Sequence, residues 1–216
     1  MKRAVLLCAL GAALVLSGCK TEIDAPVNYS ELFGPQKSIT GWLSVEVPAC
    51  KDATNKQFES SSVMEVKQKI PYIFPEAKYL QCKDEGFDSY ASFNIPIHVG
   101  GKEADCKKNQ ICAFPNDSGS WVDVKIGDEV IKKTKDVSRT DFNGNDVRIS
   151  LTITNDTGKT LHLYVPSAFV AGIPVYMSTV EANDDVKNMP IQLDNVATSV
   201  VIKGKPVSVF ADKDKE

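Results

Sequence analysis

Apolar and polar residues alternate over most of the second half of the chain, and this pattern constrains its fold more than any other feature. Apolar side chains occupy every second position in three stretches: residues 122–126, 147–153 and 161–165. Successive side chains of a β-strand point to opposite faces, so this period predicts strands with one buried face. Three further apolar segments are also expected to be strands: residues 168–177, 198–203 and 206–211.

The first half of the chain shows the same alternation in shorter runs. Leu43, Val45 and Val47 share one face of a predicted strand, and residues 77–82 and 90–99 are expected to form two more. The last of these contains Pro96, which has no amide hydrogen to donate. We therefore expect that part of the strand to lie at a sheet edge or a bulge.

Residues 60–70 interrupt the alternation with a helical pattern. Ser62 and Glu65 have the spacing of a capping box, and apolar residues recur at helical intervals up to Pro71. We expect one helix here, ending at Pro71, because proline cannot continue the hydrogen-bond ladder of a helix.

Together these patterns predict a mainly β protein built from two units. A small α+β unit with one short helix is expected over residues 37–115, and an antiparallel β-sandwich-like unit over residues 119–211. A single continuous domain is the alternative. The charged residues 212–216 are expected to form a frayed tail.

The first eighteen residues read as an export leader. Lys2 and Arg3 are followed by an apolar stretch over residues 4–16, which is too short for a bilayer core that needs about twenty residues. The sequence Leu16-Ser17-Gly18-Cys19 then resembles the lipobox of bacterial lipoproteins. An ordinary secretory signal with a chance cysteine is the alternative.

The resemblance implies that the thiol of Cys19 carries a diacylglyceryl group and that cleavage before Cys19 exposes an amine that is acylated as well. Several acyl chains give lasting attachment to a membrane, where one chain gives only marginal binding. Lys20, in place of an inner-membrane-retaining Asp, implies delivery to the outer membrane, where we expect the protein to face the periplasm. Residues 19–36, with Pro26 and Pro35, are expected to form a flexible tether.

Four cysteines remain in the mature chain beyond Cys19. An even number in an exported protein predicts two disulfides. Three connectivities are possible, and we favour Cys50–Cys82 with Cys106–Cys112, since these close a long loop and a short polar loop. A zinc site is the rival, but the paired Cys-x-x-Cys spacing that it needs is absent.

The sequence offers few groups for catalysis. His98 and His162 both fall on alternating strands and are expected at the surface, and no Gly-x-Ser-x-Gly motif occurs. Residues 141–146 begin like a calcium loop but have no Gly at the sixth position, so we expect a turn there and no metal. No phosphate-binding or dinucleotide-binding motif is present, and we expect no cofactor.

The last functional feature that the sequence indicates is a candidate contact surface. Residues 164–176 are unusually apolar, and Tyr164, Phe169 and Tyr176 are the candidate partner contacts, although buried strands also explain the composition. The formal net charge of −3 and the solvated basic run at residues 132–135 argue against nucleic acid. We expect a non-catalytic module that binds another envelope protein or polymer. An envelope hydrolase or cell-wall-modifying enzyme, and an inhibitor or exclusion factor, are the alternatives.

Overall fold

A computed structural model of the protein describes residues 20–138, 146–183 and 188–215. The leader, Cys19 and all but the last residue of the expected turn at residues 141–146 lie outside this described part. Its strands are β1 (Thr21–Asn28), β2 (Lys37–Val47), β3 (Lys78–Glu85), β4 (Asp88–Val99), β5 (Ile111–Pro115), β6 (Trp121–Ile126), β7 (Val147–Thr154), β8 (Leu161–Val170), β9 (Ile173–Ala182), β10 (Met189–Leu193) and β11 (Val207–Asp212). Its helices are α1 (Tyr29–Leu32), α2 (Ser61–Ile73), α3 (Asp128–Val137) and α4 (Asn195–Val201), with the short 3₁₀ helices η1 (Glu103–Asp105) and η2 (Lys213–Lys215).

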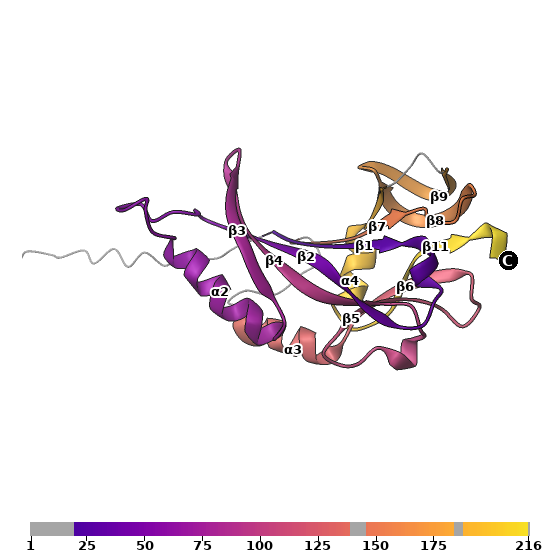
Figure 1. Cartoon of the computed structure of the whole chain (residues 1–216), viewed down its shortest axis with the longest axis horizontal. Helices are drawn as coiled ribbons and strands as arrows, with labels where there is room; N and C mark the ends of the chain where they lie inside the picture. Colours follow the sequence, from indigo (N-terminus) through magenta and orange to yellow (C-terminus); the bar gives the residue numbers. More distant parts are fainter. Residues whose placement is uncertain (1–19, 139–145, 184–187, 216) are drawn as a thin grey trace, which may run out of the picture.

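The strands join in one sheet that closes on itself as a nine-strand barrel. The order around the ring is β10, β7, β1, β2, β4, β5, β6, β11 and β8, and the pairing of β10 with β8 completes it. β3 and β9 are not part of the ring and form hairpins with β4 and β8 (Figure 1). The prediction of a β-sandwich-like unit is therefore wrong, although the protein is mainly β as expected.

The barrel closes because β1 inserts between the two halves of the chain. This strand runs antiparallel to β2 and parallel to β7, and it buries Ile23, Ala25 and Val27. The prediction of a flexible tether over residues 19–36 is wrong for the described residues, since most of them lie in β1 and α1. Pro26 concealed the strand pattern, but β2 pairs with β1 only as far as Asp24, so the proline lies beyond that ladder.

One hydrophobic core fills the barrel and draws on both of the expected units. Phe93 and Ile97 come from the first, and Leu163 and Phe210 come from the second. The expected boundary at residues 115–119 is the turn between β5 and β6, which pair with each other. The predicted boundary between units 37–115 and 119–211 therefore falls within one sheet and does not separate two sheets.

The expected edge at Pro96 is present. β3 pairs with β4 as far as Asn94, and β5 pairs with it from His98 onward. Pro96 thus lies in the gap between two strands that share one edge of β4, where a missing amide hydrogen breaks no pairing on that side.

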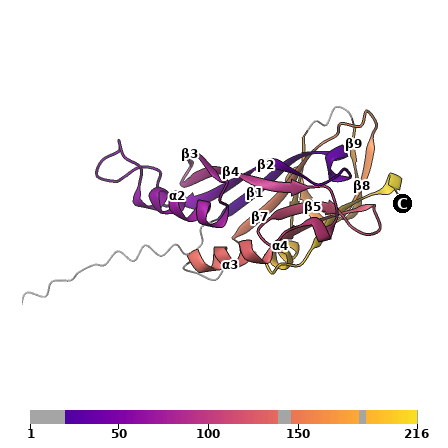
Figure 2. The same ribbon diagram turned by 60° about the horizontal axis from the view of Figure 1, so that its bottom comes forward.

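Helix α2 confirms the predicted helix. The predicted capping box at Ser62 and Glu65 is wrong, because the cap is Ser60, whose Oγ accepts a hydrogen bond from the Val63 amide at 3.3 Å. The predicted end at Pro71 is wrong, because the helix continues to Ile73 and the Phe74 amide still donates to the Ile70 carbonyl at 2.8 Å. Helices α2 and α3 contact each other and lie along one flank of the molecule (Figure 2).

Helices α3 and α4 have no counterpart among the predicted elements. Residues 198–203, predicted as a strand, instead lie mostly in α4. Asp194 caps this helix by accepting a hydrogen bond from the Ala197 amide at 2.7 Å, and the buried Thr198 and Val201 are three residues apart, as on one helix face. The basic run at residues 132–135 lies on α3, where Lys133 forms an ion pair with Glu129 at 2.9 Å.

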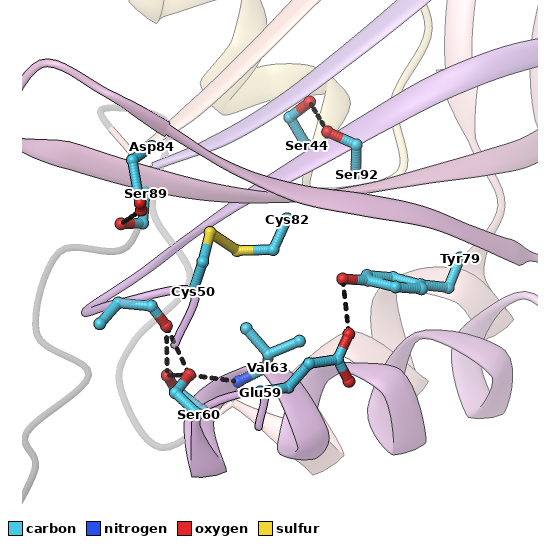
Figure 3. The surroundings of a disulfide bond; sticks show 12 residues. Ser44, Cys50, Glu59, Ser60, Val63, Tyr79, Cys82, Asp84, Ser89 and Ser92 are labelled. Carbon is cyan, nitrogen blue, oxygen red and sulfur yellow. Dashed lines mark hydrogen bonds between the residues drawn. A yellow bond between two sulfur atoms is a disulfide. The ribbon is translucent and has the colours of Figure 1, made fainter. Parts of the chain in front are cut away.

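Both favoured disulfides are confirmed: Cys50 pairs with Cys82 and Cys106 pairs with Cys112. Figure 3 shows the first bond joining the segment after β2 to β3, beside the start of α2. The bond therefore fixes the β2–α2 loop to the β3–β4 hairpin.

The C-terminal residues pack against the barrel. Asp212 is 2% exposed and accepts a hydrogen bond from the hydroxyl of the buried Tyr29. Burial and this carboxylate raise the pKa of the Tyr29 hydroxyl well above its usual range. The Lys215 ammonium lies 3.2 Å from the centroid of the Phe33 ring. The prediction of a frayed tail over residues 212–216 is therefore wrong for residues 212–215.

Candidate functional site: the β8–β9 hairpin

The three predicted contact residues lie on the outer face of the β8–β9 hairpin. Tyr164 pairs with Thr179, Tyr176 with Ser167, and Phe169 with Pro174, so each contact residue has a partner on its own face of the hairpin. The inward positions of β8 are filled by buried apolar residues: Leu161, Leu163, Val165, Ala168 and Val170. The alternation shifts by one residue after Val165, which keeps the contact residues on the outer face.

The exposed apolar side chains concentrate at the turn end of this hairpin. Four of them, here called the β9 patch, are Phe169, Ile173, Tyr176 and Met177, with exposed fractions of 36%, 67%, 74% and 61%. By register Phe169 and Tyr176 point to the outer face, whereas Ile173, the partner of Val170, points to the opposite face. Ile173 is exposed although its strand partner Val170 is buried, so β9 leaves the barrel surface near the turn. Met177 falls one residue outside the range predicted from the sequence.

Ile173, Tyr176 and Met177 of the β9 patch lie on a free strand edge, because within the described residues β9 pairs only with β8. From Ile173 to Val180 this strand has no charged residue. The outer strand of the other hairpin, β3, is different: it carries Lys78, Lys83 and Asp84 along its length. Charged side chains protect a free edge from pairing with other chains, so of these two outer strands β9 is the less protected.

The backbone of β9 nevertheless limits how a partner can bind. The turn residues Ala171 and Gly172 both have positive φ, 49° and 79°, as in the two-residue turns that fix hairpin register. Pro174 offers no amide hydrogen, and Met177 has a φ of 45°, which breaks the regular strand geometry. A continuous added strand would meet both interruptions. The side chains of the β9 patch are therefore the better contact.

Tyr164 has a different environment from the other two candidates. Its ring lies 5.8 Å from that of Trp121, edge to face, and the Lys213 ammonium lies 5.0 Å from its centroid. Tyr164 is half-buried by this packing. The structure thus assigns Phe169 and Tyr176, but not Tyr164, to the exposed patch.

The two histidines occupy separate outer faces. His162 is exposed, with Nδ1 3.2 Å from an Asp214 carboxylate oxygen and Nε2 3.9 Å from one of Glu181. His98 is half-buried on β4, and burial lowers the pKa of its imidazole, against the opposing field of Glu76. Both positions agree with the surface placement expected from the alternation.

A hollow of about 380 Å³ lies near the Pro96 gap. Its lining includes both a carboxylate, from Glu76, and an ammonium, from Lys78. The side-chain oxygen of Asn94, also in the lining, is buried without a hydrogen-bond partner within the described structure. Side chains of opposite charge do not select one class of ligand, so the β9 patch remains the stronger candidate.

Across residues 20–138, 146–183 and 188–215, no three His, Cys, Asp or Glu side chains gather as a metal site would require. Within the same ranges, no helix has both the length and the apolar character needed to cross a membrane.

Comparison with known proteins identifies a family. A family model described as "Domain of unknown function (DUF7424)" matches residues 21–215. No curated protein and no solved structure matches the chain.

Proposed function

This chain belongs to the DUF7424 family, and we propose that it is a lipid-anchored cell-envelope protein that acts as a non-catalytic binding module at the outer membrane. The lipobox at Leu16–Cys19 supports the anchor. The β9 patch supports the binding role, and its partner on this proposal is another envelope protein with an apolar surface.

The observation that carries the binding role is the exposure of Ile173, Tyr176 and Met177 on a strand that the barrel does not need. The ring of nine strands closes without β9. Fully burying one large apolar side chain contributes about 1.5–3 kcal/mol, so covering Ile173, Tyr176 and Met177 would favour association. A folded surface that leaves such side chains in water gains stability when a partner covers them.

The anchor supports the same role by confining the protein to a thin layer. Binding between two molecules held at one membrane resembles an intramolecular event with a raised effective concentration. A patch of four side chains is small compared with a stable interface in solution. Confinement at the membrane offsets that small size, because it reduces the affinity that the patch must supply.

The test is a photocrosslinking amino acid at Tyr176 in the full-length protein, activated in intact cells. We expect a crosslink to one envelope protein, and we expect Ile173→Ser to remove it, because that change deletes an apolar contact that the same strand edge presents from its other face. Val196→Ser is the matched control, since Val196 is equally apolar and 75% exposed on α4. The proposal is wrong if the crosslink pattern is the same in both variants or if Tyr176 crosslinks to no envelope protein.

A further inference from the structure

The residue bonded to Cys19 is held in the fold. The Lys20 amide donates to a Glu46 carboxylate oxygen at 2.9 Å, and the Glu46 amide donates to the Lys20 carbonyl at 2.8 Å. The Lys20 ammonium also lies 3.2 Å from a carboxylate oxygen of Asp88. The chain therefore enters the barrel at a fixed point, where β2 ends and β4 begins.

A large apolar side chain projects close to this entry point. Asp88 is the first residue of β4, and Phe87 precedes it in the turn of the β3–β4 hairpin. Phe87 is fully exposed, and Gly86 beside it has a φ of 66° with open space around it. Nothing in the described fold covers the Phe87 ring, and the barrel gains no stability from its position.

A second exposed phenylalanine lies at the same end of the molecule. Phe58, 64% exposed, belongs to the loop between β2 and α2. Figure 1 shows this loop and the β3–β4 hairpin tip at the end of the molecule opposite β9. The disulfide Cys50–Cys82 joins the loop to the hairpin, so Phe58 and Phe87 belong to one cross-linked part of the molecule.

From this geometry we infer that the β3–β4 hairpin tip, through Phe87, is a second contact with the lipid surface that holds the acyl chains of Cys19. This inference rests on the proposed lipid anchor. The partner that the tip contacts is a bilayer, because the peptide chain that leaves the fold at Lys20 continues directly to Cys19, with a Cα–Cα distance of about 3.8 Å. Aromatic rings favour the membrane–water interface.

A single exposed ring binds lipid too weakly to act alone. The acyl chains, however, keep the tip within a few nanometres of the bilayer, which makes its contact an intramolecular one. Two contacts fix an orientation where one would allow the protein to tumble. With the tip against lipid, β9 at the opposite end is directed away from the membrane. The two ends lie far apart, because β4 alone spans about 40 Å at 3.3 Å per residue.

The orientation is tested on the full, lipidated protein, purified in detergent and reconstituted into phosphatidylethanolamine–phosphatidylglycerol vesicles. A fluorescent dye is attached through Glu85→Cys, next to the tip, and the vesicles contain brominated lipids that quench dyes at the interface. We expect quenching at position 85, loss of that quenching when Phe87→Ser is added, and no quenching at the control site Val196→Cys. Unchanged melting temperatures verify that the variants fold.

The outcomes separate the orientation from the anchor. If the dye at position 85 is unquenched on protein that sediments with the vesicles, or if Phe87→Ser leaves the quenching intact, the orientation is wrong and the anchor stands. If Cys19→Ser protein still fractionates with cell membranes, the proposed anchor itself is wrong. A dye that is shielded from aqueous quenchers but not from brominated lipids would indicate a protein contact at the tip, and this would also overturn the inference.

Discussion

Glu59 shows how one residue connects the loop, the helix and the sheet around the first disulfide. Its carboxylate accepts a hydrogen bond from the Lys67 ammonium at 2.7 Å. It accepts another from the Tyr79 hydroxyl at 3.0 Å (Figure 3). The Lys67 bond holds the pKa of the Glu59 carboxyl below its usual value, against the effect of burial. Burial, with the bond to Glu59, raises the pKa of the Tyr79 hydroxyl to about 12.

We predict that Glu59→Gln lowers the free energy of unfolding by about 0.5–1 kcal/mol at pH 7, the range for a partly exposed ion pair. A carboxyl with a lowered pKa in the folded state stabilises the fold above its ordinary pKa, and this contribution is lost as the pH falls through the folded-state pKa. The difference from the unchanged protein should therefore shrink on acidification. Urea denaturation between pH 7 and pH 3 measures it. A constant difference across that range contradicts the assignment.

At the scale of elements, the β2–α2 loop and the β3–β4 hairpin depend on each other. The loop has little regular structure of its own, with one isolated bridge between Lys51 and Glu59. Cys50–Cys82 closes this region across 32 residues, whereas Cys106–Cys112 closes only six. In the chain-entropy model, the cost of closing a loop in the unfolded chain grows with loop length, so the first disulfide should stabilise the fold more.

We predict that replacing both Cys50 and Cys82 with Ala lowers the free energy of unfolding by about 3–4 kcal/mol on that model. The matched double change at Cys106 and Cys112 should cost about 2 kcal/mol by the same relation, apart from any packing lost at the buried Cys112. Urea denaturation of the oxidised proteins compares the two. An equal or reversed order would show that loop length does not decide the contribution of these bonds.

At the scale of the whole molecule, the closed barrel makes the two predicted units one structure. β1 pairs with β2 on one side and β7 on the other, so strands from both halves of the chain share one ladder. β10 closes the ring through Ile191, which pairs with Leu151 of β7 and Val170 of β8 and is fully buried. A sheet that closes on itself and surrounds one core should unfold as a unit.

The two tryptophans test this directly, because Trp42 lies in the first predicted unit and Trp121 in the second. We predict that, in Trp42→Phe and in Trp121→Phe protein, the fluorescence of the one remaining tryptophan changes at the same urea concentration as the circular dichroism of that variant. A single shared transition is expected because the core is continuous. Two separated midpoints would mean that the halves are independent domains.

The sequence determined most elements whose side chains repeat with a strong local period. The buried residues of β4, from Ala91 to Val99, follow the predicted alternation, and α2 forms where helical spacing was predicted, although its cap is Ser60 and not Ser62. The disulfide pairing followed from loop lengths, and the apolar stretch that holds the β9 patch was visible as composition. The predictions were wrong where the periodic pattern was short or interrupted. Pro26 interrupts the alternation of β1, so that strand was not predicted, and the short α4 was predicted as a strand.

Only the tertiary structure decided how these elements join and which apolar residues stay in water. A period of two identifies a strand with one buried face, but it carries no information about the neighbouring strand, so a barrel and a sandwich give the same pattern. The parallel pairing of β1 with β7 and the closing contact between β10 and β8 join residues far apart in the chain. For the same reason the sequence could not tell Tyr164, packed against Trp121, from Tyr176, whose ring is exposed, because burial depends on long-range contacts.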